Sequence, residues 1–165
     1  MTLGVLMKLL HILAAFWFIS GLIARDYTFW RAAKVSTVQG IQSLLQVSEF
    51  FEQWAVIRGA FLVLVFGLLT VWLQHWQLFG FLQGAPTNWL LISFIIFAGS
   101  GAVIGPLGLI ARRQQRTQAL EEALAKGMIT PELTAALNDK VVNNFRKVEL
   151  ATVVLILILM VVKPF

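Results

Sequence analysis

The fold is decided by the longest uncharged stretch of the chain, residues 59–111, which reads GAFLVLVFGLLTVWLQHWQLFGFLQGAPTNWLLISFIIFAGSGAVIGPLGLIA. A helix needs about 20 residues to cross the hydrocarbon core of a bilayer, so this stretch is long enough for two crossings. Gly80, Gly84 and Pro86 mark a turn near its middle. We therefore predict two membrane spans and a short connection, at about 55–76, 88–111 and 77–87 respectively.

A further hydrophobic segment lies on either side of this stretch. One covers about residues 3–24 and ends at Arg25. The other has an uncharged core at 150–162, which is too short to cross alone and is expected to begin earlier, giving a span at about 144–163. Glu149 then lies below the membrane surface. The predicted fold class is all-α: a polytopic membrane protein with one membrane domain, a four-transmembrane-helix bundle with helical cytoplasmic extensions.

Composition agrees with this class. Of the 165 residues, 59% are hydrophobic and 13% are charged, and the mean hydropathy is +0.82. There is no cysteine, which excludes disulfides, thiolate metal sites, iron–sulfur clusters and c-type haem attachment. The basic residues flank hydrophobic spans and form no patch with aromatic residues, so the expected partner is the lipid bilayer and no nucleic acid is expected.

The distribution of basic residues predicts the orientation. The first connection carries Arg25, Arg31 and Lys34, and the third carries Arg112, Arg113, Arg116, Lys126, Lys140, Arg146 and Lys147. The middle connection has none. Because cytoplasmic loops carry the excess of Lys and Arg, we predict that the first and third connections are cytoplasmic and that both termini lie outside.

The two cytoplasmic connections, about 25–54 and 112–143, are predicted to be helical. Residues 36–51 place apolar side chains along one stripe, with polar residues opposite. In the later connection a helix at 114–126 is expected to stop at Gly127, followed by Thr130 as an N-cap and Pro131 at the first helical position. Solvated extensions that space the spans and a docking site for a partner are both compatible with this pattern.

His11 is the histidine that lies at membrane depth. It is about eight residues from the outer end of its span, hence about 12 Å deep. An ionisable group there is costly without a partner, and imidazole is the commonest nitrogen ligand of haem iron. Ala14 and Ala15 share its helical face and leave room for a flat ligand or for close helix packing. A ligand-binding histidine and a structural one bonded to a neighbouring helix both remain open.

The other candidate groups near the outer side are His75, Lys8 and Lys163. His75 is expected at the outer boundary, about 12 Å from the level of His11, which argues against both ligating one haem within a subunit. A symmetric His11–His11 pair across a homodimer stays open, since a two-fold axis along the membrane normal preserves depth. The lysines either snorkel to the headgroups or bind carboxylates such as porphyrin propionates.

Toward the inner side, Arg58 and Glu149 lie at similar predicted depths. Opposite charges in such a setting are expected to pair, as a structural salt bridge with Arg25 or Arg146 nearby, or as part of a proton or substrate relay. In the third span, Gly101 and Gly105 have the spacing of close helix contacts, and Pro106 is expected to kink the helix.

Two segments resemble a known family. Lys8-Leu9-Leu10-His11-Ile12, followed by Trp17 and Gly21, resembles the first span of the HemJ-type protoporphyrinogen oxidases. The end of the chain, from Glu149 to Val161-Val162-Lys163-Pro164-Phe165, resembles that family's terminal motif. A family of uncharacterised bacterial proteins, described as predicted four-helix integral membrane proteins, is similar in its opening and its Lys-Pro ending. Its basic helical connection between the third and fourth spans suits this chain better.

The resemblance implies a b-type haem with His11 as the metal ligand. With a haem held there, Lys8 and Lys163 are expected to contact its carboxylates, and the expected location is a bacterial inner membrane. If the activity carries over, it also implies oxidation of a porphyrinogen by a HemJ-like oxidoreductase. Val148 and Ala151 stand where that family has asparagine and proline, and its histidine-containing turn between the later spans is missing. Haem binding is therefore expected to be kept more readily than oxidase chemistry.

These observations favour a haem-binding membrane protein, oligomeric, that serves redox or tetrapyrrole chemistry. The alternative is a non-catalytic accessory or structural subunit of a larger membrane complex, in which His11 makes a helix–helix hydrogen bond. A small-molecule transporter is a third class, but the chain lacks the repeated broken helices that such proteins use.

Overall fold

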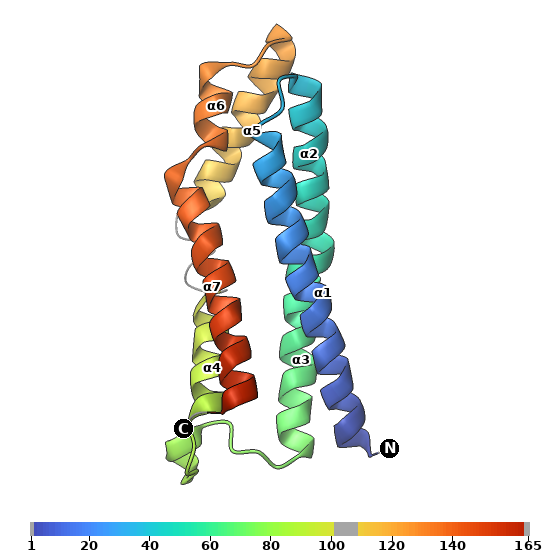
Figure 1. Ribbon diagram of the computed structural model, residues 1–165, viewed down its shortest axis with the longest axis vertical. Coiled ribbons are helices and arrows are strands. Elements are labelled where there is room, and N and C mark those ends of the chain that lie inside the picture. Colours follow the sequence, from blue (N-terminus) through green and yellow to red (C-terminus); the bar gives the residue numbers. More distant parts are fainter. Residues whose placement is uncertain (1, 101–108, 164–165) are drawn as a thin grey trace.

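The computed structural model describes residues 2–100 and 109–163, and in these ranges the chain is helical with no strand. The elements are α1 (Leu3–Ala32), α2 (Val38–Phe51), the π-helical segment η1 (Glu52–Ile57), α3 (Arg58–Leu73), the 3-10 turn η2 (Gly80–Gln83), α4 (Trp89–Gly99), α5 (Leu109–Lys126), α6 (Pro131–Leu137) and α7 (Lys140–Val162). Figure 1 shows an elongated bundle in which both chain ends lie at the same, lower end. The all-α prediction is confirmed.

The helix at 38–73 is continuous through α2, η1 and α3 and runs beside α1 along most of the molecule (Figure 1). The two helices come very close at two glycines. A Cβ added at Gly21 would lie 2.3 Å from the Cβ of Ala55, and one added at Gly59 would lie 3.0 Å from the Cα of Phe18. Small residues at such positions let helix backbones approach, so this contact fixes how α1 and its partner helix are rotated against each other.

The segment η1 is a π-helical turn within that continuous helix. A π turn bonds i to i+5 and adds a residue to the turn, which changes the faces presented by the residues before and after it. It contains Ala55, the residue against which Gly21 packs, and Glu52, which reaches α1. The hydrophobic pattern of the sequence gives no sign of this turn.

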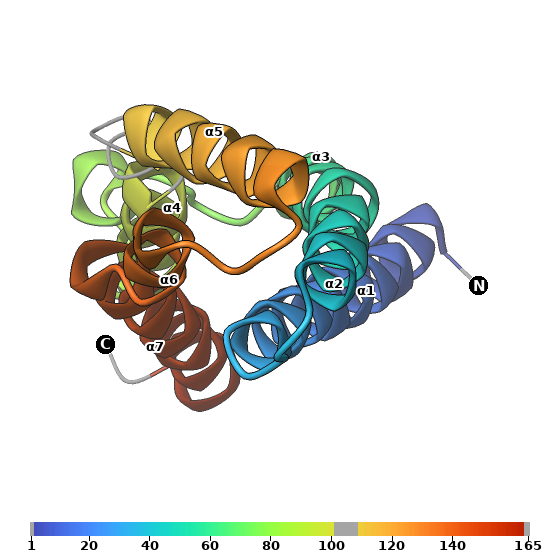
Figure 2. The same ribbon diagram turned by 90° about the horizontal axis from the view of Figure 1, so that it is seen from above.

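The upper half of the bundle has its own hydrophobic core, formed where α2, α5 and α6 surround the end of α1 (Figure 2). The buried side chains come from α1, α2, α5 and α6: Phe29, Ala32, Val38, Ile41, Leu45, Ala119, Ala123, Leu133 and Leu137. The connections are therefore more than solvated spacers. They bury their apolar stripes against each other and form a helical cap on the bundle.

The predicted helix signals of these connections are confirmed. The helix at 38–51 has Thr37 as its N-cap, and α5 ends at Lys126 before Gly127, whose φ is +66°. The Thr130 side chain accepts a hydrogen bond from the backbone N–H of Leu133 at 3.2 Å, and Pro131 opens α6. These are local effects, because each depends only on residues within one turn.

The N-terminus of α7 is held by Asp139. Its carboxylate accepts hydrogen bonds from the backbone N–H of Val141 at 2.8 Å and from the guanidinium of Arg112. Burial by itself raises the pKa of Asp139, but the bonds from Arg112 and from the backbone outweigh it and hold the pKa below the usual aspartate value. Asp139 thus joins the start of α7 to α5.

Two helices of the described chain are long and apolar enough to cross a membrane, Leu3–Ala32 and Val38–Leu73, and α4 is a shorter apolar helix. At their upper ends both long helices extend beyond the predicted spans 3–24 and 55–76, because the helical cap packs around them there, whereas the second helix ends at Leu73, before the predicted residue 76. The predicted third span and its features at Gly101, Gly105 and Pro106 fall partly or wholly outside the described residues. The number of four spans therefore stays a prediction.

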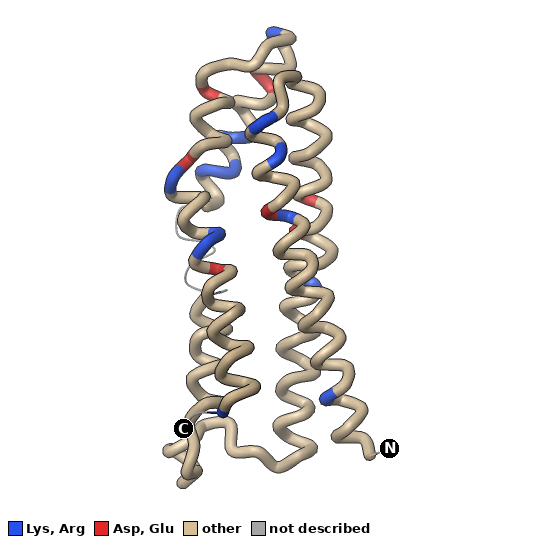
Figure 3. Tube along the Cα trace, in the orientation of Figure 1, with Lys and Arg blue, Asp and Glu red and all other residues tan. Residues whose placement is uncertain are grey.

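Charge divides the molecule into two halves. Figure 3 shows the charged residues gathered in the upper half, hereafter the charged half. The lower half, hereafter the apolar half, includes residues 3–24, 59–100 and 150–163, in which Lys8 and Lys163 are the charged side chains among the described residues. An uncharged band below a charged cap is the pattern of a helical membrane protein.

Candidate functional site

A cavity of about 520 Å³ lies in the apolar half, between the pair α1 and α3 and the pair α4 and α7. Its walls are almost entirely aliphatic and aromatic side chains. The three residues proposed from the sequence as a cofactor site, Lys8, His11 and Lys163, all line it. They come from the two ends of the chain, and the packing of the helix pairs brings them around one space.

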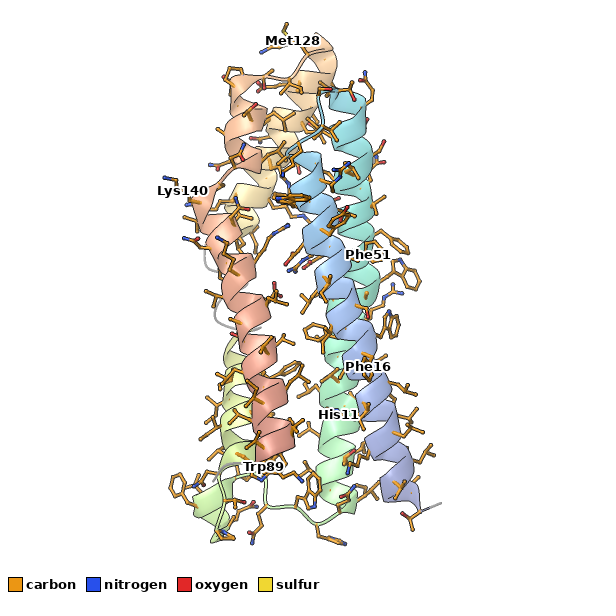
Figure 4. The ribbon with its side chains drawn as sticks, in the orientation of Figure 1. His11, Phe16, Phe51, Trp89, Met128 and Lys140 are labelled. Carbon is orange, nitrogen blue, oxygen red and sulfur yellow. The ribbon has the colours of Figure 1, made fainter. Side chains whose placement is uncertain are left out.

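The His11 ring is held by α3. Its Nδ1 lies 2.9 Å from the backbone carbonyl oxygen of Val63, so Nδ1–H donates to that oxygen and Nε2 keeps its lone pair. Among the described residues, no hydrogen-bond partner of Nε2 is found. Figure 4 marks His11 on α1 in the apolar half, beside α3. Metal-ligating histidines have the same feature, one ring nitrogen fixed by a hydrogen bond and the other available, and a structural histidine between two helices shares the first part of it.

Gly67 makes room for this ring. A Cβ at Gly67 would lie 3.0 Å from the Cε1 and 3.1 Å from the Nδ1 of His11, which is closer than ordinary side-chain contacts. Any side chain here would push the imidazole away from the Val63 carbonyl. Neither Gly67 nor Val63 was predictable from the sequence, because a glycine and a backbone oxygen in an apolar helix give no signal there.

Lys163 lies at an aromatic corner of the cavity. It follows the last residue of α7 in a left-handed conformation, with φ +48°, and its Nζ lies 5.3 Å and 5.2 Å from the ring centroids of Trp76 and Trp89. These two rings contact each other edge to face at 5.9 Å. Cations are attracted to such ring faces, so the aromatic pair holds the ammonium group near the cavity. Lys8 is exposed and lies three residues before His11 on α1.

His75 does not join the site. It is exposed, adopts a left-handed conformation with φ +56° in the turn after α3, and is absent from the described lining of the cavity. Met160 does line the cavity, from α7. Its thioether is the one described lining group, besides the imidazole of His11, of a kind that protein chains use as an axial haem ligand. Met160 was not predicted from the sequence, because a methionine in an apolar helix usually serves only packing.

The predicted Arg58–Glu149 pair is wrong. Glu149 binds Arg25, with 2.5 Å between its Oε2 and the guanidinium Nη2, whereas Arg58 lies over the ring of Trp54 at 3.5 Å from the centroid. Equal depth was the basis of the prediction, but the rotation of each helix decides which side chains meet. Arg58 is exposed and packs against Trp54 of the same continuous helix.

Arg25 is the centre of the ion pairs instead. Only 6% of it is exposed, and it also contacts Asp26 at 2.9 Å and Glu52 at 2.8 Å. Three carboxylates from α1, η1 and α7 thus share one guanidinium. A buried charge of this kind needs such partners, and removing one partner leaves the remaining charges poorly compensated. The cluster joins α1 and η1 to α7.

The comparisons with known proteins identify a family. Residues 5–164 match the family described as Predicted integral membrane protein (DUF2269). This chain belongs to that family. Nothing in the match ties DUF2269 to the HemJ-type oxidases in particular, and no curated protein and no solved structure matches the chain. Membership in DUF2269 agrees with the apolar band of the bundle and its helices long enough to cross a bilayer.

Proposed function

We propose that this DUF2269 protein binds a b-type haem through His11 in the membrane and serves redox or tetrapyrrole chemistry of the protoporphyrinogen-oxidase kind. One observation carries the proposal: the His11 ring lines an apolar cavity, its Nδ1–H donates a hydrogen bond to the Val63 carbonyl oxygen, and its Nε2 keeps a lone pair. Neutral imidazole oriented by a backbone carbonyl through its other nitrogen is what iron ligation requires.

The cavity suits the group in size and chemistry. Cofactor pockets in proteins span roughly 300–1,000 Å³ and are mostly apolar with a few placed polar groups. At about 520 Å³, with Lys8 and Lys163 among its lining residues, the cavity offers apolar walls for a porphyrin ring and ammonium groups for its propionates. The residues of the chain thus fit a b-type haem.

A bound haem would supply one-electron transfer or the oxidation of a tetrapyrrole. The chain's part is then to bind and to exclude water. The Val63 carbonyl holds the His11 imidazole in one orientation and makes its Nε2 a stronger electron-pair donor to a metal. The apolar walls of the cavity lower the local polarity. Met160 and the two lysines complete the set of polar or polarisable groups that reach the cavity.

The topology proposed with this function is that of four spans in a bacterial cytoplasmic membrane, with both termini outside. It is supported by the helices long enough to span, by the apolar band and by the basic cap. Because the cavity lies within one chain, a single copy provides the whole proposed site. We propose that assembly into a homo-oligomer or a larger membrane complex adds partners and leaves this site intact.

The test is the visible absorption spectrum of the protein purified from haem-replete cells in mild detergent. We expect a Soret band for the wild type, its loss in His11→Ala, and its retention in His75→Asn. The last variant is a matched control, since it removes the other imidazole and asparagine tolerates the left-handed φ. A wild type with no porphyrin absorbance, or a full Soret band in His11→Ala, would overturn the proposal.

The alternative is a non-catalytic accessory subunit, and the same His11–Val63 contact gives it support. The hydrogen bond from His11 on α1 to the Val63 carbonyl on α3 also links the two helices. Under this alternative His11→Gln keeps the stability of the protein, because an amide N–H replaces the ring N–H, and the wild type carries no pigment. Haem binding instead requires that His11→Gln lose the Soret band, since glutamine is a poor iron ligand.

A further inference from the structure

A second cavity, of about 510 Å³, lies in the charged half and has two chemically different ends. One end is lined by guanidinium groups that include Arg113, Arg116 and Arg146. The other is apolar and includes Phe18, Phe97, Val153 and Ile156, which also line the lower cavity. Phe18 and Phe97 meet edge to face at 6.3 Å, so these side chains form a partition between the two cavities. The apolar end of the second cavity thus faces the apolar half.

Carboxylates also line this cavity, but they are distributed unevenly among its arginines. Glu52 and Glu149 are bound to Arg25, together with Asp26. Glu49 forms ion pairs with both Arg113, at 3.3 Å, and Arg116, at 3.6 Å. The guanidinium groups on the α5 and α7 side of the cavity therefore exceed the carboxylates that contact them.

Arg146 is the least satisfied of these groups. Its contact with Asp26 is 3.6 Å long, and Asp26 already accepts a bond from Arg25. Its Nη1 is buried and has no hydrogen-bond partner among the described residues. A buried charged donor without an acceptor is strongly unfavourable, which indicates that an acceptor from elsewhere belongs there.

The same guanidinium is held in place by packing. The guanidinium carbon Cζ lies 3.6 Å from the centroid of the Phe29 ring in Arg146 and 5.2 Å from it in Arg116. The side chains of the two arginines are 18% and 14% exposed. Stacking on a buried ring fixes the donors before any ligand arrives, which lowers the ordering cost of binding.

We propose that this cavity binds the phosphate group of an anionic phospholipid, with Arg116 and Arg146 as its principal contacts and the apolar end beside its acyl chain. Guanidinium groups match phosphate oxygens in geometry and charge. Because the apolar end of their cavity is shared with the cavity of the apolar half, the two arginines lie next to that half, at the level of headgroups when the long helices cross a bilayer. The site is independent of the haem cavity, and a free phosphate would offer the same chemistry.

The experiment uses the full chain purified in dodecyl maltoside, with thermal unfolding followed by circular dichroism. Dioleoylphosphatidylglycerol, dioleoylphosphatidylcholine and inorganic phosphate are added separately, each over a range of concentrations. We expect phosphatidylglycerol to raise Tm and phosphatidylcholine to leave it unchanged. A rise with inorganic phosphate alone, of equal size, would assign the site to a free phosphate ligand.

Variants separate this site from general attraction to a basic protein. Arg146→Gln and Arg116→Gln should each weaken the apparent affinity for phosphatidylglycerol about tenfold, the usual loss for one charge-assisted hydrogen bond. Lys147→Gln is the matched control, because Lys147 is exposed, adjacent on α7 and carries the same charge. If Arg146→Gln does not fold, Arg116→Gln carries the comparison. No Tm shift with either ligand, or equal losses in Arg146→Gln and Lys147→Gln, would overturn the proposal.

Discussion

Gly21→Ala is expected to destabilise the protein by separating α1 from η1. The added methyl group would lie 2.3 Å from the Cβ of Ala55 and 3.1 Å from its backbone carbon. Carbon atoms in contact lie about 3.5 Å apart or more, so the two helices must separate by about 1.2 Å or tilt. The backbone of Ala55 cannot rotate out of the way as a long side chain would. Overpacking of this kind costs about 1–3 kcal/mol, and we expect the upper part of that range.

The assay is the free energy of unfolding in mixed detergent micelles, measured by circular dichroism as the fraction of sodium dodecyl sulfate is raised. Ala55→Gly in the Gly21→Ala background removes the opposing methyl group and should restore part of the loss, which a double-mutant cycle quantifies. Gly4→Ala is the control, because a Cβ there meets Gln74 at an ordinary 3.5 Å. A Gly21→Ala protein as stable as the wild type would refute the close contact.

Three further outcomes are expected. Glu149→Gln should lower the free energy of unfolding by about 1–3 kcal/mol. The loss is smaller than for a buried charge with no partner, because Arg25 keeps two other carboxylates. An unchanged free energy of unfolding would show that the pair is absent. The depressed pKa of Asp139 contributes stability that is present above its unfolded pKa of about 4 and is lost as the pH falls through the lower folded value. Between pH 6 and pH 3, Asp139→Asn should therefore lose less stability than the wild type, and identical curves would contradict this. Reporter fusions after Gly84 should face the periplasm and those near Lys126 the cytoplasm, and the reverse result would disprove the predicted orientation.

The sequence alone was sufficient for the features that depend on local composition. The helical class follows from hydropathy summed over about 20 residues, and the ends of α5 and α6 follow from Gly127, Thr130 and Pro131. His11, Lys8 and Lys163 were also identified from the sequence, because ionisable groups in apolar segments stand out whatever the packing. That they line one cavity was not predictable from their positions in the chain.

Tertiary structure alone decided which side chains meet. Depth along a helix can be counted from the sequence, and it suggested Arg58 for Glu149. The partner is Arg25, because rotation about the helix axis is set by the glycine contact at Gly21 and by the π turn in η1. The same packing brings the Val63 carbonyl to His11. Hydropathy is a property of each residue, whereas these contacts depend on the relative rotation of two helices, which only their packed surfaces determine.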